Sequence, residues 1–195
     1  MSNYKKKIIR VIDFLGSLSG ILFLSPLLIG IFFLIFIKEG SPFFYQERVG
    51  KNMKRFILMK FRTMSINTEN CATHLVDSSK ITKIGKFLRK TKLDEIPQLF
   101  NVLKGEMSFV GPRPCLPSQV VLIQLRKEYN LYEFLPGITG LAQIKKIDMS
   151  DPILLAKTDH KMMSRLNLRY YFYYIFMTIF GKGLGDRISN NYSKK

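Results

Sequence analysis

The apolar run from Phe14 to Ile37, FLGSLSGILFLSPLLIGIFFLIFI, constrains this chain more than any other feature, because it contains no charged side chain. A straight α-helix of that length would rise about 36 Å at about 1.5 Å per residue, whereas a bilayer core is about 30 Å thick. A cleaved signal peptide fits poorly, since the run is too long and no small-residue cleavage site closes it. The sequence therefore predicts a membrane anchor.

Two features favour an anchor that enters the membrane and returns to the same side. Ser25-Pro26 lies at the centre of the run, where Pro26 cannot donate to the carbonyl of Leu22, so the helix is expected to break or kink. The Ser25 hydroxyl can replace part of the lost backbone bonding. Lys and Arg tend to stay cytoplasmic, and both flanks are basic, with Lys5, Lys6, Lys7 and Arg10 before the run and Lys38, Arg48 and Lys51 after it. The alternative is a kinked helix that spans the bilayer, because proline is common in such helices.

The remaining residues, 41–195, are long enough to form one domain with a packed core after the membrane helix of residues 1–40. We expect an α+β fold that is mostly helical, with short strands. Residues 170–180, YYFYYIFMTIF, are too short to span a membrane. They predict either a buried core helix or a helix lying in the membrane interface, and seven aromatic side chains among eleven residues favour the interface.

Local patterns predict most elements of the domain. The segments SPFFYQERVG and RFILMKFRTM are expected to be extended and joined by a turn at Gly50-Lys51-Asn52. Helical spacing runs from Ile81 to Leu103, with Pro97 dividing it or starting a second helix, and Gly105 ending it. GEMSFVGPRP is expected to be a rigid loop and FLPGITGLAQI a turn followed by a short strand. Helices are also expected at 117–129 and 154–180.

The charge of the chain predicts an anionic partner. It has 31 Lys and Arg against 14 Asp and Glu, a net charge of +17. Nucleic acid, a phosphorylated metabolite or an acidic membrane would all fit that charge. Against this background Asp94 and Glu95 stand together, in a stretch from Lys80 to Arg113 that holds eight basic residues and one other acid. The pair is either surface decoration or two carboxylates held in a cationic pocket.

Other motifs that the sequence lacks limit the reactions in which Asp94 and Glu95 could take part. The glycines do not form a phosphate-binding G-x-x-x-x-G-K loop, and two histidines in the chain give little support for histidine-based catalysis. What remains is a carboxylate that acts as a nucleophile or a metal ligand beside phosphate-binding cations. An aspartate can attack phosphorus and form an acyl phosphate, and magnesium can bind carboxylates and phosphates together.

Three blocks of this sequence resemble the monotopic bacterial phosphoglycosyl transferases, which are polyprenyl-phosphate sugar-1-phosphate transferases. The blocks are KFRTM at Lys60–Met64, LDEIPQLFNVLKGEMSFVGPRP at Leu93–Pro114 and PGITGLAQI at Pro136–Ile144. With the anchor and its Ser25-Pro26 the resemblance runs over nearly the whole chain. It implies the minimal catalytic form of the family, with a re-entrant anchor on the cytoplasmic face of the bacterial inner membrane.

The resemblance also implies roles for particular residues. Asp94 would be the nucleophile that attacks the sugar-bearing phosphate of a UDP-sugar and releases UMP, and polyprenyl (undecaprenyl) phosphate would then take the phosphosugar from Asp94. Magnesium would contact Asp94 and Glu95, and Glu95 would position the metal or help to activate the lipid phosphate. Arg89 and Arg113 lie at phosphate-binding positions of the family. Lys60 and Arg62, in the KFRTM block, are weaker candidates for substrate binding, and Asp159 keeps an acidic position of the family.

The sequence departs from the family pattern after Ile144, where Lys145-Lys146-Ile147-Asp148 replaces an Asn-Gly-Arg-like turn and Met162 replaces a tyrosine. This divergence leaves the identity of the sugar open. The sequence as a whole also leaves open the glycan pathway and whether the protein dimerises in the membrane. The competing class is a non-enzymatic, membrane-tethered basic protein that binds anionic lipid or nucleic acid. That class explains the charge and the anchor but not the Asp-Glu pair in a Gly/Pro frame, and no nucleic-acid-binding signature is visible.

Overall fold

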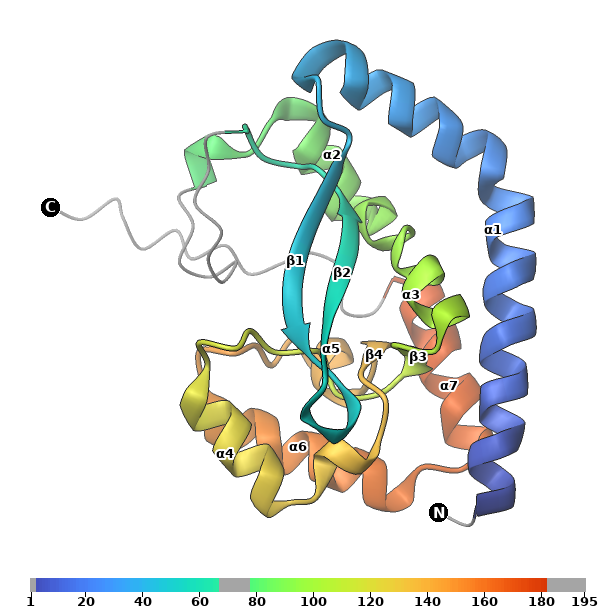
Figure 1. The fold of residues 1–195 in the computed structure, drawn as a ribbon, viewed down its shortest axis with the longest axis vertical. Helices are drawn as coiled ribbons and strands as arrows, with labels where there is room; N and C mark the ends of the chain where they lie inside the picture. Colours follow the sequence, from blue (N-terminus) through green and yellow to red (C-terminus); the bar gives the residue numbers. More distant parts are fainter. Residues whose placement is uncertain (1–2, 67–77, 182–195) are drawn as a thin grey trace, which may run out of the picture.

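The computed structural model describes residues 3–66 and 78–181. Figure 1 shows an α+β fold in which helices predominate and the strands are short, as the sequence predicts. One long helix, α1 (Asn3–Glu39), runs along one side of the molecule and bends over its end. The other helices are α2 (Lys83–Thr91), α3 (Gln98–Lys104), α4 (Val120–Glu128), α5 (Leu141–Ile144), α6 (Pro152–Arg165) and α7 (Leu168–Ile179).

Helix α1 continues through Pro26 instead of dividing into two separate arms. Proline leaves the carbonyl of Leu22 without its usual helical donor, and the Ser25 hydroxyl donates to that carbonyl at 2.8 Å. The helix can therefore bend in Figure 1 without losing its helical course. Within the part of the chain that the structure describes, α1 is the one helix long and apolar enough to cross a membrane, by length and composition.

The predicted hairpin is confirmed. Strands β1 (Phe43–Val49) and β2 (Arg55–Phe61) pair antiparallel from Phe43–Phe61 to Val49–Arg55. The turn is a single 3-10 turn, Lys51–Met53, in which Asn52 and Met53 have positive φ. This hairpin lies across the middle of the molecule in Figure 1, between α1 and the lower helices.

The segment 81–103 forms two helices, as predicted. Thr82 caps α2 by accepting a hydrogen bond from Gly85 N, and Lys92 ends α2 in the left-handed conformation. A 3-10 turn, Leu93–Glu95, follows, and Pro97 is the N-cap of α3. Gly105 ends α3 with φ of 87°, a conformation that glycine adopts without strain.

The structure corrects two expectations for the second half of the chain. The expected loop GEMSFVGPRP contains β3 (Ser108–Val110), which pairs in parallel with β4 (Gly137–Thr139). Three-residue strands are too short to leave a periodic signal in a sequence. The expected helix over 154–180 is two helices, because Asn167 interrupts it and caps α7 by accepting from Tyr170 N at 2.9 Å.

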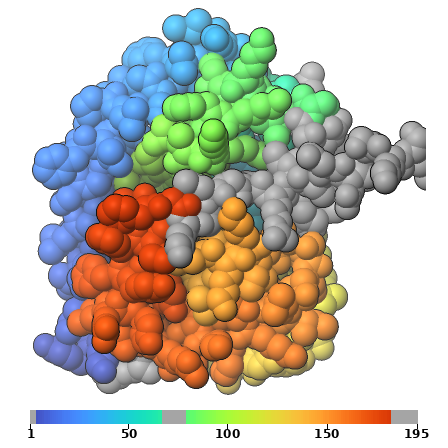
Figure 2. Space-filling model, turned by 180° about the vertical axis from the view of Figure 1, so that it is seen from behind, coloured from blue at the N-terminus to red at the C-terminus, as the bar shows by residue number. Residues whose placement is uncertain are grey.

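Helix α7 has one buried face and one exposed aromatic face. Tyr171 and Tyr174 belong to a core cluster with Ile9 of α1 and Met162 of α6. Figure 2 shows α7, in red and orange, lying beside α1, in blue. The exposed large side chains of α7 are Tyr170, Phe172, Tyr173, Phe176 and Ile179.

A close contact between two glycines lets β3 and β4 approach one another. A Cβ atom on Gly137 would lie 2.0 Å from the backbone nitrogen of Gly111, so we expect Gly137→Ala to push the two strands apart. Overpacking of this kind typically costs about 1–3 kcal/mol. The matched control is Gly30→Ala in α1, where a Cβ atom would meet nothing within 4 Å. Thermal unfolding in detergent should show a lower midpoint for Gly137→Ala only; equal midpoints for the two variants would contradict this packing.

Candidate active site

Asp94 and Glu95 lie in the 3-10 turn between α2 and α3. Their residues are only 5% and 8% exposed, so the pair is not surface decoration. The left-handed residue Lys92 reverses the chain after α2, and the turn is closed by Glu95 N donating to the carbonyl of Lys92 at 3.1 Å. Buried carboxylates need cations or hydrogen-bond donors around them, and two of these come from distant parts of the chain.

Lys60 and Arg113 both bind the same oxygen of Glu95. Lys60 Nζ, on β2, lies 2.7 Å from Glu95 Oε1, and Arg113 Nη2, in the loop after β3, lies 3.0 Å from it. Burial alone would raise the pKa of Glu95, but the Lys60 ammonium and the Arg113 guanidinium outweigh burial and hold that pKa well below the usual range of a glutamate. Glu95 is therefore an anion at neutral pH and a weak proton acceptor, suited to holding cations.

Arg89 contacts the KFRTM block and has one guanidinium nitrogen that forms no hydrogen bond among the described residues. Its Nε donates to Thr63 Oγ1 at 2.8 Å. Helix α2 lies close enough for this contact because a Cβ atom on Gly85 would be only 2.0 Å from the Thr63 carbonyl oxygen. Arg89 Nη1 is buried and, among the described residues, has no hydrogen-bond partner. A buried guanidinium nitrogen in that state can receive a phosphate oxygen.

Arg62, a weaker candidate from the same block, forms its hydrogen bonds with Ser41 and Phe43. Its Nε donates to the Ser41 carbonyl at 2.9 Å, and its Nη2 donates to Ser41 Oγ at 3.3 Å and to the Phe43 carbonyl at 3.1 Å. These bonds fasten the end of β2 to the connection between α1 and β1. The structure thus places Arg62 at the exit of the membrane helix, whereas Lys60, two residues earlier, reaches Glu95.

Asp159, on α6, lies behind the Arg113 loop and is completely buried. It accepts two hydrogen bonds from Arg126 of α4, at 2.6 Å and 3.2 Å, and Arg126 Nη1 also donates to the carbonyl of Arg113 at 2.8 Å. Burial would lower the pKa of Arg126, but Asp159 raises it, so this guanidinium stays charged. In this arrangement Asp159 supports Arg113 through Arg126.

Arg126 belongs to the site although no motif in the sequence pointed to it. The sequence does contain one indication of its burial. Arg126 follows Leu122 by four residues, and residues at i and i+4 share one face of a helix. Those two are the buried residues of α4. A basic residue on the apolar face of a predicted helix indicates a buried partner.

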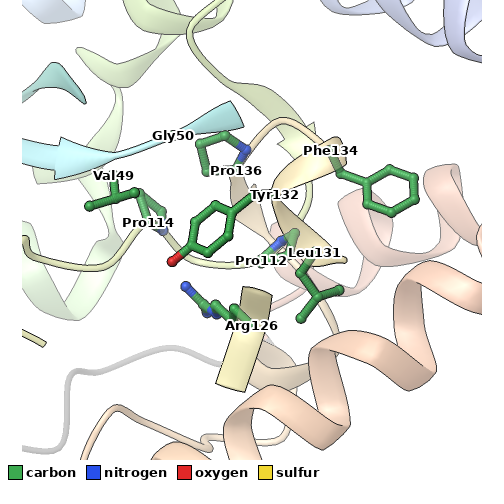
Figure 3. Close-up of a pocket in the computed structure, with 9 residues that line it drawn as sticks. All are labelled: Val49, Gly50, Pro112, Pro114, Arg126, Leu131, Tyr132, Phe134 and Pro136. Atoms are coloured by element: carbon green, nitrogen blue, oxygen red, sulfur yellow. The ribbon is translucent and has the colours of Figure 1, made fainter. Parts of the chain in front are cut away.

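Three successive carbonyls of the Arg113 loop are each bound by a donor. Arg126 holds the carbonyl of Arg113, Arg48 Nη1 holds that of Pro114 at 2.9 Å, and the backbone nitrogen of Val49 holds that of Cys115 at 3.0 Å. Figure 3 shows the Arg126 guanidinium beneath the loop that carries Pro112 and Pro114. The cavity between them has a volume of about 10 Å³, which is room for about one water molecule. The backbone that carries Arg113 is therefore closely confined.

Asp94 and Glu95 are adjacent carboxylates that could hold a magnesium ion. Among the described residues no group of three His, Cys, Asp or Glu side chains forms a complete metal cage. Magnesium does not require one, because it is commonly bound through one or two carboxylates, with water and substrate phosphates as its other ligands. Asp94 and Glu95 provide those two carboxylates beside the cations already described.

The chain belongs to the bacterial sugar transferase family, whose pattern it matches over residues 4–182. It is 36% identical over 152 residues to a UDP-galactose-lipid carrier transferase of Erwinia amylovora, covering 69% of this chain and 32% of that protein. It is 37% identical over 142 residues to a UDP-N-acetylgalactosamine-undecaprenyl-phosphate N-acetylgalactosaminephosphotransferase of Aeromonas hydrophila, covering 69% and 33%. An uncharacterized sugar transferase of Bacillus subtilis is 48% identical over 109 residues, covering 55% and 54%. The chain thus spans between about a third and about half of the length of these relatives.

Loss of one partner from the buried pair of Arg126 and Asp159 should destabilise the fold strongly. Removing one partner of a buried ion pair typically costs about 3–5 kcal/mol, because the other charge is left unpaired. We expect Arg126→Gln to lower the free energy of unfolding by an amount in that range, and Arg126→Gln with Asp159→Asn to recover part of the loss. The control is Arg55→Gln, whose partner Glu47 lies at 3.1 Å on the exposed surface of the hairpin, where such pairs contribute about 0–1 kcal/mol. The free energies of unfolding are measured by denaturant titration. Equal losses of stability in Arg126→Gln and Arg55→Gln would contradict a buried ion pair at Arg126.

Proposed function

We propose that this chain transfers sugar-1-phosphate from a UDP-sugar to a polyprenyl phosphate such as undecaprenyl phosphate, with release of UMP, as the first membrane step of glycan assembly. The observation that carries the proposal is the buried Asp94-Glu95 pair with Lys60 and Arg113 on one oxygen of Glu95. The names of the relatives from Erwinia amylovora and Aeromonas hydrophila, which refer to UDP-sugars and lipid carriers, support the same reaction class.

In the first step a carboxylate oxygen of Asp94 attacks the sugar-bearing phosphorus of the UDP-sugar. The new bond joins that oxygen to phosphorus, the bond between phosphorus and the bridging oxygen breaks, and UMP leaves with the electron pair. The product is an acyl phosphate that links the sugar phosphate to Asp94. No proton has to be removed from the nucleophile, which is consistent with a site built from carboxylates and cations.

In the second step an oxygen of the polyprenyl phosphate attacks the same phosphorus. The acyl phosphate bond breaks, the Asp94 carboxylate is restored, and a polyprenyl diphosphosugar is released. Both steps exchange one activated phosphate bond for another, so the site mainly has to align the reactants and stabilise negative charge.

The cations of the site divide this work. Arg113 and Arg89 carry guanidinium groups, which can bind phosphate oxygens in a bidentate manner. Lys60 balances the charge of Glu95, and Glu95 in turn keeps Lys60 and Arg113 in place. Asp94 and Glu95 would hold magnesium, which supplies neutralisation of the phosphate charge when bound. These roles agree with a glutamate that remains ionised.

We also infer that α1 is re-entrant and that the catalytic residues face the cytoplasm at the bacterial inner membrane. The basic flanks and the Ser25-Pro26 pair inside α1 support this arrangement. The exposed aromatic face of α7 lies beside α1 in Figure 2 and would rest in the interface, where anionic lipids attract a chain of net charge +17.

The reaction can be tested without any lipid. Enzyme, magnesium and a UDP-sugar labelled in the sugar should give UMP and stoichiometric label on the protein, both absent in Asp94→Asn, because the attacking anion is gone. The control is Glu128→Gln, which removes an exposed carboxylate from α4 and should behave as wild type. Normal turnover by Asp94→Asn would exclude Asp94 as the nucleophile. Release of UMP only after polyprenyl phosphate is added, with no adduct trapped, would indicate direct transfer, and absence of UMP altogether would favour a non-enzymatic membrane-tethered protein.

The topology is tested by labelling single cysteines. In a Cys71→Ser background, Asn3→Cys and Glu39→Cys should both react with a membrane-impermeant thiol reagent only in inside-out vesicles, because both flanks of α1 would lie on the cytoplasmic side. Pro26→Leu should favour a straight spanning helix and bring one flank to the opposite side. Labelling of Asn3→Cys from outside in intact cells would rule out the re-entrant arrangement.

A further inference from the structure

Helix α1 carries one aspartate near its apolar run, and the structure buries it against the catalytic part of the molecule. Asp13 is completely buried. Its Oδ1 accepts three hydrogen bonds, from the backbone nitrogen of Phe109 at 2.9 Å, from Ser108 Oγ at 3.1 Å and from the Tyr171 hydroxyl at 2.5 Å. These donors belong to β3 and α7, so a single carboxylate joins the anchor to two elements of the domain.

One turn earlier in α1, Arg10 binds the end of α3. Its Nη1 donates to the Val102 carbonyl at 2.6 Å and its Nη2 to the Leu103 carbonyl at 2.9 Å. The last carbonyls of a helix lack partners within the helix and attract cations. Because α3 begins three residues after Glu95, this short helix connects Arg10 directly to the turn that holds Asp94 and Glu95.

Small residues bring the two surfaces into close contact beyond this polar pair. A Cβ atom on Gly16 would lie 2.9 Å from the ring of Phe109, and one on Gly20 would lie 3.1 Å from Leu99 of α3. Ser17 between them is completely buried. Glycines spaced four apart allow close packing of membrane helices. Figure 1 shows α3 and β3 lying against the straight part of α1.

An ionisable residue in a membrane helix is costly and usually serves a function. Apolar packing alone would hold α1 on the domain, but a carboxylate with three donors and a guanidinium on two carbonyls also define one register and one orientation. We propose that Arg10 and Asp13 are positioning residues that fix α1 to α3 and β3, and thereby set the height of Asp94 relative to the membrane surface. The inference rests on the proposed function, since it concerns the step in which the lipid phosphate reaches Asp94.

The two half-reactions depend differently on this height. A UDP-sugar is dissolved in water, so it can reach the site at any distance of the domain from the membrane. The phosphate of a long-chain polyprenyl phosphate is confined to the membrane surface by its tail, so its distance from Asp94 depends on how the domain is held on α1. Loosening the junction should therefore impair transfer to the lipid and spare formation of the adduct.

The test uses Arg10→Met, which keeps the bulk of the side chain and removes both donors to α3, and Asp13→Asn, which replaces the carboxyl group by an amide. Lys7→Met is the control, because it removes an exposed cation from the same end of α1. Each full-length variant is placed in nanodiscs and charged with labelled UDP-sugar, and the rate of adduct formation is measured. The adduct is then chased with long-chain polyprenyl phosphate in the bilayer or, in detergent, with a short-chain polyprenyl phosphate that is soluble in water.

We expect Arg10→Met and Asp13→Asn to form the adduct at close to the wild-type rate and to transfer it to the bilayer acceptor about tenfold more slowly, since misplacement by about 1 Å can reduce rates by larger factors. Transfer to the soluble acceptor should be close to wild type, and Lys7→Met should be normal throughout. If Arg10→Met does not fold, Tyr171→Phe removes a single bond to Asp13 and should show the same selective loss to a smaller degree.

Equal losses in both half-reactions, or equal losses with both acceptors, would show a purely structural role and overturn the inference. Unchanged transfer to the bilayer acceptor in every variant would overturn it as well. Failure of the proposed function itself is distinguishable, because the wild-type protein would then give neither UMP nor adduct.

Discussion

The two bonds to Glu95 Oε1 connect the parts of this structure on which its chemistry depends. One comes from the end of the β1–β2 hairpin and the other from the loop after β3, while Glu95 itself lies between α2 and α3. An anion buried to this degree would be unstable without them. Because two cations share one carboxylate oxygen, the positions of the three segments are coupled. Asp94 lies next to Glu95 in the same turn.

Buried charges behind and beside the site extend this coupling. Arg126, which is paired with Asp159, stands behind Arg113 and donates to its backbone carbonyl. Arg48 and the end of β1 bind the next two carbonyls, so the loop is tied to both α4 and the hairpin. A guanidinium group at the site can present its fork to a phosphate only if its own backbone is fixed. Arg126 and Arg48 therefore hold the backbone of the loop that carries Arg113.

The membrane helix is part of the same assembly. Its exit is fastened to β2 by Arg62, and its beginning is bonded to α3, β3 and α7 by Arg10 and Asp13. The short helix α3 lies between the anchor at one end and the Asp94-Glu95 turn at the other. Bonds at both ends of α1 therefore fix the position of this helix relative to the Asp94-Glu95 turn.

The sequence by itself determined the elements that depend on local chemistry. The uncharged run predicts α1, Gly50-Lys51-Asn52 predicts the hairpin turn, and Pro97 and Gly105 mark the limits of α3, since each acts through the conformation of its own backbone. The Asp94-Glu95 pair and its basic surroundings were equally visible. Tertiary structure alone decided that Lys60 and Arg113, at 35 and 18 residues' distance from Glu95, meet on one oxygen, whereas Arg62 turns to the anchor. It also decided the pairing of β3 with β4 and the bonds of Arg126, Arg10 and Asp13. Contacts between residues far apart in the chain follow no period along it, and only the packing of the elements brings such charges together.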